Sequence, residues 1–240
     1  MKIEFVTHCL NYSRLLAYQL TSFAKATILF PLEVFVTICY TEEDKLTREV
    51  VRYFTNLPNL PMTNLNWKLM PMSRERLCRR AIGRNVAALQ TKADWIWFVD
   101  CDYCFGNKMF EALGTTLDNV PQKNVLVFPQ TILSCSKKFG VSLIEEACGE
   151  LPRFTSLLPL WAFTEQTIRR AIGGLQIVRG DWALVHGYCK NYKKYQEPSL
   201  EWAPNFDDVQ FRLDVGNDGY KISLPEVYRI RHEKLQKGVY

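Results

Sequence analysis

The sequence has no long hydrophobic run. No stretch of its 240 residues approaches the roughly 18 to 20 uninterrupted apolar residues that a membrane-spanning helix needs, because Glu, Lys or Pro breaks the longest candidates. The opening MKIEFVTHCL carries Glu4 and His8 where a secretory signal needs an unbroken apolar segment. We therefore expect a soluble, cytoplasmic protein without a transmembrane segment, whose chain opens with a strand.

The eight cysteines lack the tight spacing of a disulfide framework. Cys101 and Cys104 form a lone CxxC, and neither a second CxxC nor a nearby pair of histidines completes a tetrahedral zinc site. The pattern favours reduced thiols in a cytosol-like compartment. It also favours two buried or half-buried thiols at Cys101 and Cys104 over a redox or zinc centre.

Internal repeats, low-complexity tracts and linkers are also lacking, and we expect one domain over residues 1–240. The net charge of +5 fits an enzyme with an anionic substrate as well as weak nucleic-acid binding. No recognised nucleic-acid motif accompanies the basic KNYKKY of residues 190–195, so no nucleic-acid partner is expected, and an RNA-binding module stays an alternative. Residues 190–204 are instead predicted to form a mobile loop over a site, or to touch a charged acceptor or a membrane surface.

The first half of the sequence alternates β-rich runs with amphipathic helical patterns. Thr41 is a plausible cap for the second helix, and Ser73 opens the third. The alternation implies an α/β fold with an open, mostly parallel sheet, whose ligands lie outside the carboxyl ends of the strands. The predicted strands cover residues 3–7, 32–41, 66–72 and 94–100, and the predicted helices cover residues 11–26, 42–57 and 73–92.

The second half of the sequence is less regular. A strand is predicted over residues 124–132, a short helix over 141–151, and irregular loops that line a site over 151–180. Residues 205–234 predict a helix, a glycine-marked turn, a strand and a final strand-like VYRIRH.

Two carboxylates, Asp100 and Asp102, directly follow the apolar strand predicted over residues 94–100. Carboxylates gathered at a cleft are costly unless a cation compensates their charge. Mg²⁺ or Mn²⁺ bound by one or two carboxylates usually completes its octahedron with phosphate oxygens and water. The motif therefore points to a nucleotide or a sugar phosphate.

A buried strand that ends in DxD also suggests a phosphatase of the haloacid dehalogenase type, whose first Asp attacks phosphorus. That family has Thr or Val two residues after the second Asp, where this chain has Cys104, and its motif ends the first strand instead of the fourth. Trapping an aspartyl-phosphate on Asp100 would revive this alternative.

The segment GRNVAALQTKADWIWFVDCD, residues 83–102, resembles the family 2 and related inverting glycosyltransferases of the GT-A fold. These carry an Arg-Asn pair, a helix, an apolar strand and then DxD. The order continues here with GDWALVHGY, NFDDVQFRL and GYKISLPEVYRIRHEK, and the final RIRHEK is similar to the β4-galactosyltransferase-like branch. The resemblance implies a Rossmann-like GT-A domain, in which residues 1–106 bind the nucleotide sugar and residues 107–240 bind the acceptor.

The activity that the resemblance implies is metal-dependent transfer of a sugar, of the hexosyltransferase type. The donor would be a UDP- or GDP-sugar, and the acceptor hydroxyl would belong to a glycan, a lipid-linked or a protein-linked molecule. Retaining enzymes of the same fold also use DxD and a late His, so retaining transfer stays an alternative to inversion.

The resemblance also implies roles for the acidic residues and the late histidine. Asp102 would bind Mn²⁺ (or Mg²⁺) directly together with His232, while Asp100 would contact the ribose or the water shell of the metal. Asp208 matches the general base. Asp207 stands where the family usually has Glu, which leaves open which member of the pair faces the acceptor.

The remaining site predictions concern the donor and the acceptor. Arg76, Arg80 and Arg84 are spaced to share one helix face, and of these only Arg84 is assigned to the diphosphate. Trp182 and Tyr188 flank the predicted acceptor loop, although core packing is an equal rival for Trp182. The residues predicted to bind the donor are Thr7, His8, Asn11, Glu42, Asp44, Arg84, Asn85, Asp100 and Cys101.

Overall fold

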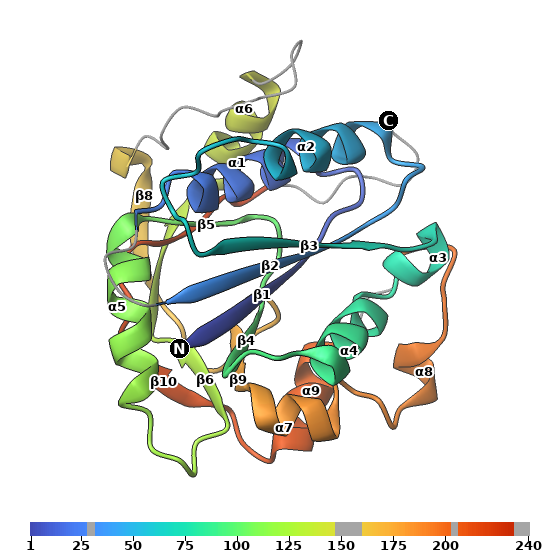
Figure 1. Cartoon of the computed structure of the whole chain (residues 1–240), viewed down its shortest axis with the longest axis vertical. Helices are drawn as coiled ribbons and strands as arrows, with labels where there is room; N and C mark the ends of the chain where they lie inside the picture. Colours follow the sequence, from blue (N-terminus) through green and yellow to red (C-terminus); the bar gives the residue numbers. More distant parts are fainter. Residues whose placement is uncertain (28–31, 147–159, 203–205, 233–240) are drawn as a thin grey trace.

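The computed structural model describes residues 1–27, 32–146, 160–202 and 206–232. Its main sheet has the strand order β10-β6-β9-β4-β1-β2-β3 (Figure 1). Neighbouring strands are parallel except where β9 pairs antiparallel with β4 and β6, so the predicted α/β architecture with a mostly parallel sheet is confirmed. The strands are β1 (Lys2–His8), β2 (Glu33–Tyr40), β3 (Leu65–Pro71), β4 (Trp95–Phe98), β6 (Leu126–Pro129), β9 (Gln176–Arg179) and β10 (Tyr220–Ile222).

A second, smaller sheet has the order β5-β11-β7-β8, formed by β5 (Tyr103–Phe105), β11 (Val227–Arg229), β7 (Thr131–Cys135) and β8 (Phe163–Thr167). β5 pairs antiparallel with β11 directly after the two carboxylates that follow β4. The backbone N–H of Ile230 then donates to the carbonyl oxygen of Asp102 over 2.8 Å. The small sheet thus places the late segment that contains His232 beside the end of β4.

Helices cover both faces of the main sheet. Figure 1 shows α1 and α2 on one side and α4, α7 and α9 on the other, as right-handed crossovers from parallel strands require. Among the described helices, none combines the length and apolarity needed to cross a bilayer. The helices are α1 (Ser13–Ala24), α2 (Lys45–Thr55), α3 (Arg74–Leu77), α4 (Arg80–Gln90), α5 (Asn107–Asp118), α6 (Lys137–Glu146), α7 (Gly180–His186), α8 (Lys193–Gln196) and α9 (Asp207–Val215), with a 3-10 turn at Leu160–Ala162.

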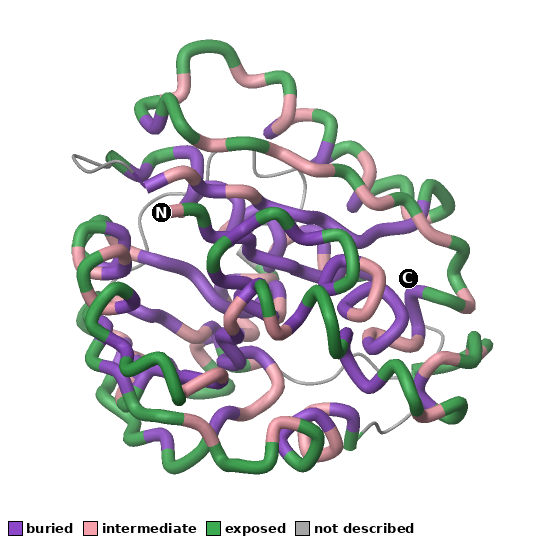
Figure 2. The backbone as a smooth tube through the Cα atoms, turned by 60° about the horizontal axis from the view of Figure 1, so that its bottom comes forward, coloured by how far each residue is buried: buried purple, intermediate pink, exposed green. Residues whose placement is uncertain are grey.

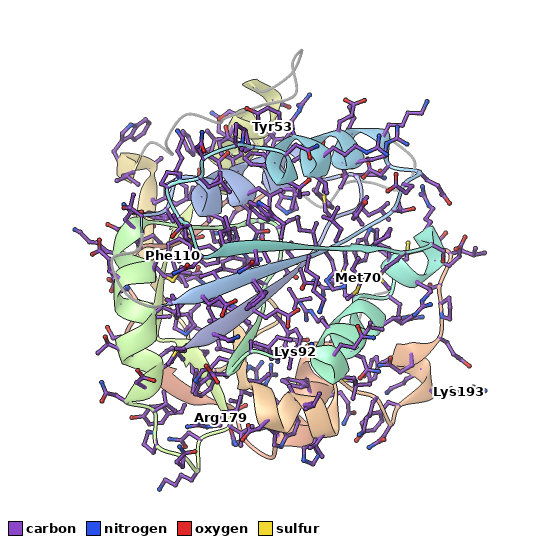
Figure 3. The ribbon with its side chains drawn as sticks, viewed as in Figure 1. Tyr53, Met70, Lys92, Phe110, Arg179 and Lys193 are labelled. Carbon is purple, nitrogen blue, oxygen red and sulfur yellow. The ribbon has the colours of Figure 1, made fainter. Side chains whose placement is uncertain are left out.

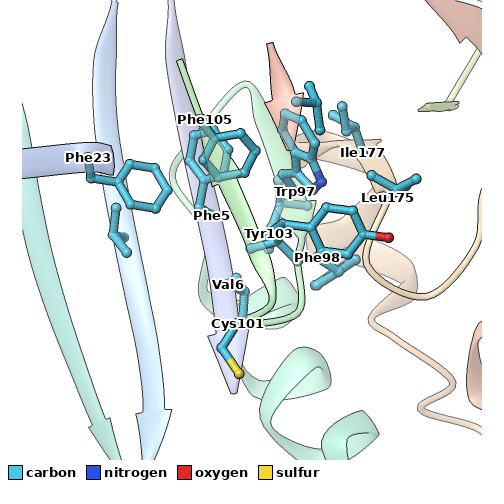
Figure 4. Close-up of a cluster of buried hydrophobic side chains, with 14 of the residues drawn as sticks. Phe5, Val6, Phe23, Trp97, Phe98, Cys101, Tyr103, Phe105, Leu175 and Ile177 are labelled. Atoms are coloured by element: carbon cyan, nitrogen blue, oxygen red, sulfur yellow. The ribbon is translucent and has the colours of Figure 1, made fainter. Parts of the chain in front are cut away.

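The core lies between the sheet and these helices. Phe5 of β1 stacks on Trp97 of β4 with ring centroids 5.2 Å apart and meets the edge of Phe23 of α1 at 4.9 Å (Figure 4). Each fully buried large side chain contributes about 1.5 to 3 kcal/mol through removal of apolar area from water. Figure 2 shows the strands as the buried centre of the molecule, and Figure 3 shows Lys193 extending from its rim.

The helix predicted over residues 73–92 is two helices, α3 and α4. The backbone leaves helical geometry at Arg79 (φ −115°, ψ 83°), and the short α3 is fastened by the N–H of Ser199, which donates to the carbonyl of Glu75 over 2.8 Å. Arg76 is therefore separated from Arg80 and Arg84, and the expectation of one face with three arginines is wrong.

The helix cap predicted at Thr41 is also wrong. Asp44 is the N-cap of α2, since its Oδ1 accepts from the N–H of Thr47 over 3.1 Å. Asp44 also accepts from the N–H of Asn11 over 2.6 Å, so it joins the loop after β1 to the start of α2. Among the three acidic residues that follow Thr41, only Asp44 is of a type favoured at the N-cap, and its bond to Asn11 adds a contact outside the helix.

Irregular loops were predicted over residues 151–180, and the described part of that range contains β8 and β9 instead. β9 is four residues long, which is too short for a periodic pattern to appear in the sequence. The strand predicted over residues 124–132 is two strands, β6 and β7, in different sheets. Residues 190–204, predicted as a loop, include α8, and residues 151–159 and 203–205 lie outside the described part.

Candidate active site

The predicted acidic residues lie at the carboxyl edge of the main sheet, where β1 and β4 end. Asp100 follows β4, and its Oδ1 accepts from Nη1 of Arg80 over 2.9 Å and from Nη2 of Arg84 over 3.0 Å. Burial opposes ionisation of this carboxyl, but the two guanidinium groups outweigh burial and lower the pKa of Asp100 to about 2. Asp100 is therefore an anion held by two cations from α4.

The same two arginines reach Asp207, the first residue of α9. Nη1 of Arg84 lies 3.7 Å from Oδ2 of Asp207, and Nη2 of Arg80 lies 3.9 Å from Oδ1. The side chains of Arg84 and Asp207 are both 0% exposed, whereas that of Arg80 is 26% exposed. Arg84 is thus an internal counter-ion, and Arg80 is the member of the pair that solvent or a ligand can reach.

Asp208 lies close to Asp100 across a glycine. A Cβ added to Gly173 would be 3.8 Å from Cβ of Asp208 and 3.9 Å from Oδ2 of Asp100. The Asp208 side chain is 22% exposed, and its Oδ2 is 3.5 Å from Nη1 of Arg212, one turn along α9. The structure therefore brings the first carboxylate of the DxD and the second member of the acidic pair to one place.

A chain of hydrogen bonds runs behind these carboxylates. Nη1 of Arg84 donates to the hydroxyl of Tyr188 over 2.9 Å, and that hydroxyl is 2.9 Å from Oε1 of Gln176. Nε2 of Gln176 donates to the backbone oxygen of Asp208 over 3.0 Å. The contacts join α4, β9 and the start of α9.

Asp102 has a different cation. Its Oδ2 accepts from Nε of Arg229 over 3.0 Å, while its Oδ1 is buried without a hydrogen-bond partner among the described residues. Burial raises the pKa of Asp102, and Arg229 and His232 act in the opposite direction without cancelling it. The His232 ring meets the edge of Tyr12 with centroids 4.9 Å apart. Asp102 and His232 are thus near enough to interact electrostatically.

Thr7 and His8 lie buried at the end of β1. Neither ring nitrogen of His8 has a hydrogen-bond partner within the described ranges, and the ring packs against Gly83 of α4. Burial, strengthened by the charges of Arg84 and Arg80, lowers the pKa of His8 well below its usual range. His8 is therefore a neutral imidazole at the site edge.

The residues predicted to bind the donor after β2 have structural partners. Asp44 caps α2 as described above, and Glu42 accepts from the hydroxyl of Tyr40 over 2.8 Å and lies 3.6 Å from Arg52. Asn11 is in the left-handed region, with φ 61°, next to Asp44. Together these residues shape the loops after β1 and β2.

Asn85, Tyr188 and Trp182 also make internal contacts. Oδ1 of Asn85 accepts from the N–H of Tyr188 over 3.0 Å. The Tyr188 ring is fully buried and stacks on Phe211 at 4.4 Å, so the open aromatic platform expected there does not exist in this structure. Trp182 is partly buried, stacks on His186 at 4.5 Å and meets the edge of Phe211, which agrees with its core-packing alternative.

The burial predicted for Cys101 and Cys104 is confirmed, since both side chains are buried. Cys101 interacts with Cys9, and that contact together with burial raises the pKa of the Cys101 thiol. Cys148 lies outside the described residues.

Two hollows of the surface lie away from these carboxylates. One of about 620 Å³ lies at the amino ends of the strands, against Asp94, Trp95 and Arg179. Another of about 440 Å³ lies against β7 and β8. Neither is lined by Asp100 or Asp208, and we locate the site by its charged groups, because parallel α/β sheets bind ligands at the carboxyl edge.

Sequence reasoning assigned no site role to four residues that the structure places there. Arg80 carried a signal, since it precedes Arg84 by one helical turn. Arg229 lies three residues before His232, but no local pattern connects it with Asp102. Gly173 and Gln176 carried no signal, because their roles depend on segments that are distant in the sequence.

Comparison with known proteins tests the fold. No family model matches the sequence, and the comparison with curated proteins finds no match. Residues 1–349 of S. aureus TarS, in complex with UDP-GlcNAc, superpose with a TM-score of 0.55 at 16% identity, over 98% of this chain and 60% of that one. The mannosyltransferase PcManGT from Pyrobaculum calidifontis, with GDP-Man and Mn²⁺, superposes with a TM-score of 0.51 at 15% identity, over 95% of this chain and 56% of that one. The chain has the GT-A fold.

The GT-A fold confirms the fold class predicted from the sequence. TarS in complex with UDP gives a similar match, with a TM-score of 0.54 at 18% identity, over 95% of this chain and 60% of that one. The chain thus spans 56% to 60% of the length of these GT-A structures.

Proposed function

We propose that this chain transfers a glycosyl group, of the hexosyl type, from a nucleotide-diphosphate sugar to an acceptor hydroxyl. The observation that carries the proposal is the convergence of Asp100 and Asp208 on Gly173, at the carboxyl edge of a GT-A sheet. The donor class is supported by TarS, solved with UDP-GlcNAc, and by PcManGT, solved with GDP-Man. The residue pattern further supports a family 2-like or β4-galactosyltransferase-like enzyme.

Mn²⁺ or Mg²⁺ is the proposed cofactor, as PcManGT was solved with Mn²⁺. The described residues contain no group of three His, Cys, Asp or Glu side chains placed to hold an ion. A site with two protein ligands still fits, because Oδ1 of Asp102 is a buried acceptor without a partner there and His232 is near it. When bound, the ion would neutralise charge on the departing diphosphate.

Asp208 is the proposed general base. The acceptor oxygen forms a bond to the anomeric carbon while the bond from that carbon to the diphosphate oxygen breaks. The bonding electron pair leaves with the nucleoside diphosphate, and the acceptor proton passes to the Asp208 carboxylate. Exposure favours Asp208 over Asp207, because 22% of the Asp208 side chain is reachable and none of the Asp207 side chain is.

Arg80 replaces Arg84 as the proposed cation for the donor diphosphate. Arg84 is fully enclosed, and its bonds go to Asp100 and Tyr188. Arg80 pairs with the same Asp100 oxygen, but 26% of its side chain is exposed. On the acceptor side, Phe206 is 70% exposed directly before the acidic pair and offers the aromatic face that Tyr188 lacks.

A screen of UDP, GDP, UDP-GlcNAc and GDP-mannose with and without Mn²⁺ tests the proposal. A ligand that binds the folded state raises the unfolding temperature, and about 2.7 kcal/mol of stabilisation is expected at a hundredfold excess over Kd. We expect one nucleotide class to stabilise the protein, more strongly with Mn²⁺, and its sugar to be released or transferred. The anomeric configuration of the product, read by NMR, separates inversion from retention.

Two outcomes would contradict the proposal. If none of the four compounds raises the unfolding temperature, the proposed nucleotide-sugar donor is refuted. If a nucleotide sugar binds but its sugar is not released, a non-catalytic nucleotide-binding or RNA-binding module is favoured instead. If one donor is turned over, a glycan, a lipid-linked or a protein-linked acceptor can be sought with it.

A further inference from the structure

The buried chain of hydrogen bonds behind the site begins at Asp100. Nη2 of Arg84 donates to Oδ1 of Asp100 over 3.0 Å. Because the Arg84 side chain is 0% exposed, it contacts neither the sugar donor nor the acceptor substrate. The guanidinium also lies 5.2 Å from the centre of the Tyr188 ring, which adds a cation–π contact to its hydrogen bonds.

The direction of the next two bonds is determined by chemistry. A guanidinium can only donate, so the Tyr188 hydroxyl accepts from Nη1 of Arg84 over 2.9 Å. The hydroxyl hydrogen is then free to donate to Oε1 of Gln176, 2.9 Å away. This fixes the orientation of the Gln176 amide, whose Nε2 must face the other way.

The last bond reaches the proposed base. Nε2 of Gln176 donates to the backbone oxygen of Asp208 over 3.0 Å. Arg212 supports the same segment, because its Nη1 donates to the oxygen of Ala171 over 2.7 Å. The first turn of α9 is thus bonded to β9 as well as to its own helix.

We infer that Tyr188 and Gln176 are positioning residues, which, through Arg84, hold the base Asp208 at a fixed place relative to the donor-side Asp100. The inference rests on the proposed function. A displacement of about 1 Å between reacting groups can cost on the order of a hundredfold in rate. Three fully buried polar side chains bonded in series, Arg84, Tyr188 and Gln176, restrict such a displacement, because breaking any bond leaves a buried group unpaired.

The sharpest test is Tyr188→Phe. The substitution removes one oxygen and keeps the ring, so the stacking on Phe211 at 4.4 Å is retained while both hydroxyl bonds are lost. Gln176→Leu cuts the chain at the next link. Tyr53→Phe on α2, on the other side of the main sheet, is the matched control for loss of a tyrosine hydroxyl.

The assay is hydrolysis of UDP-GlcNAc or GDP-mannose, whichever stabilises the wild-type protein, with release of the nucleoside diphosphate as the readout. We expect Tyr188→Phe and Gln176→Leu to lower kcat by about 10-fold to 100-fold and to leave the donor KM within about twofold, since neither residue touches the donor. Urea unfolding verifies that each variant is folded under assay conditions.

The outcomes separate the two proposals. If the wild-type protein hydrolyses neither donor, the proposed function fails, and the positioning roles fail with it. If the wild-type protein is active and both variants match Tyr53→Phe in kcat, the positioning role alone is overturned, even where unfolding shows a loss of stability. A parallel rise in KM would also overturn it, because it would indicate direct contact with the donor.

Discussion

Arg229 donates from Nε to Oδ2 of Asp102 over 3.0 Å, so the carboxylate proposed to hold the metal already faces one cation. The guanidinium of Arg229 also lies 5.4 Å from the centre of the Tyr103 ring, which fixes it in place. Oδ1 of Asp102 has no hydrogen-bond partner among the described residues, and His232 lies near enough to act on the charge of this carboxyl. Two protein ligands are few for a cation that prefers six.

Metal binding is therefore expected to depend on the nucleotide. The diphosphate would supply the missing oxygens and the negative charge that Arg229 has cancelled on Asp102. In an electron paramagnetic resonance titration, Mn²⁺ should bind at least about tenfold more tightly with UDP or GDP present than without it. Asp102→Asn should abolish this difference. Tight, saturable Mn²⁺ binding to the protein alone would contradict the expectation.

Asp208→Asn should remove turnover and spare nucleotide binding. Loss of a general base typically costs about 10² to 10⁴ in rate. Asp207→Asn should instead lower stability, because Asp207 is fully buried between Arg80 and Arg84. Steady-state kinetics, nucleotide titration and urea unfolding of the two variants decide between the roles. If Asp207→Asn loses turnover at unchanged stability while Asp208→Asn stays active, the roles are reversed.

Arg84→Met should destabilise the fold far more than Arg80→Met. Removal of Arg84 leaves the buried Asp207 carboxylate with Arg80 alone, at 3.9 Å, and breaking a buried ion pair costs about 3 to 5 kcal/mol. Arg80 is partly exposed, so after its removal water can solvate part of the charge of the neighbouring carboxylates, and the loss of stability is smaller. The measurement is the free energy of unfolding in urea. Equal losses for the two variants would show that Arg84 is not the principal counter-ion.

The regular part of the fold was predictable because local patterns determine it. The apolar run at Trp95–Phe98 and the alternation before it predicted β1 to β4 and the edge at which Asp100 and Asp102 lie. β9 was missed because four residues give no period, and its place between β4 and β6 depends on partners up to 84 positions away, as in the pair of Trp95 and Arg179.

The acidic residues of the site were predicted by type and strand position, whereas their partners were not. A sequence indicates that Asp100 needs a cation but does not specify which arginine supplies it. Tyr188 was predicted to be an aromatic platform for a sugar ring because the residue that covers it, Phe211, lies 23 positions later and in another helix. Burial of that kind is decided by tertiary packing, which local propensity does not encode.

Two helical glycines should respond oppositely to alanine. A Cβ on Gly83 would overlap Nε2 of His8 and lie 3.0 Å from Sγ of Cys39, so Gly83→Ala should cost about 1 to 3 kcal/mol through overpacking. Gly114 in α5 has nothing within 4 Å of that position, and Gly114→Ala should stabilise the protein by about 0.4 to 1 kcal/mol. Thermal unfolding of both variants provides the check. A neutral Gly83→Ala would mean that His8 can move aside.

Stability should fall as the pH drops below about 6.5, the usual pKa of histidine, because His8 is buried neutral. Folding lowers the pKa of His8, so below pH 6.5 the unfolded chain binds a proton at this histidine while the folded chain does not. The contribution of neutral His8 to stability is therefore fully present only above about pH 6.5. The groups that face His8 are Arg80 and Arg84 on α4 and Asp100 after β4, with Cys39 of β2 nearby across Gly83.

The loss from one such histidine is at most about 1.4 kcal/mol per pH unit. His8→Asn should flatten the dependence of unfolding free energy on pH between about 6.5 and 5. Parallel curves for wild type and His8→Asn would show that His8 takes up its proton in the folded state.

The antiparallel strand β9 has a consequence during synthesis. β4 and β6 are complete once residue 129 has been made, but each lacks a neighbour until residues 176–179 emerge. At about 5 to 20 residues per second, the nascent chain exposes two hydrophobic strand edges for several seconds. Chaperone dependence in cells should therefore track the interval between residues 129 and 176, and lengthening that interval should increase aggregation before it changes the stability of the finished protein.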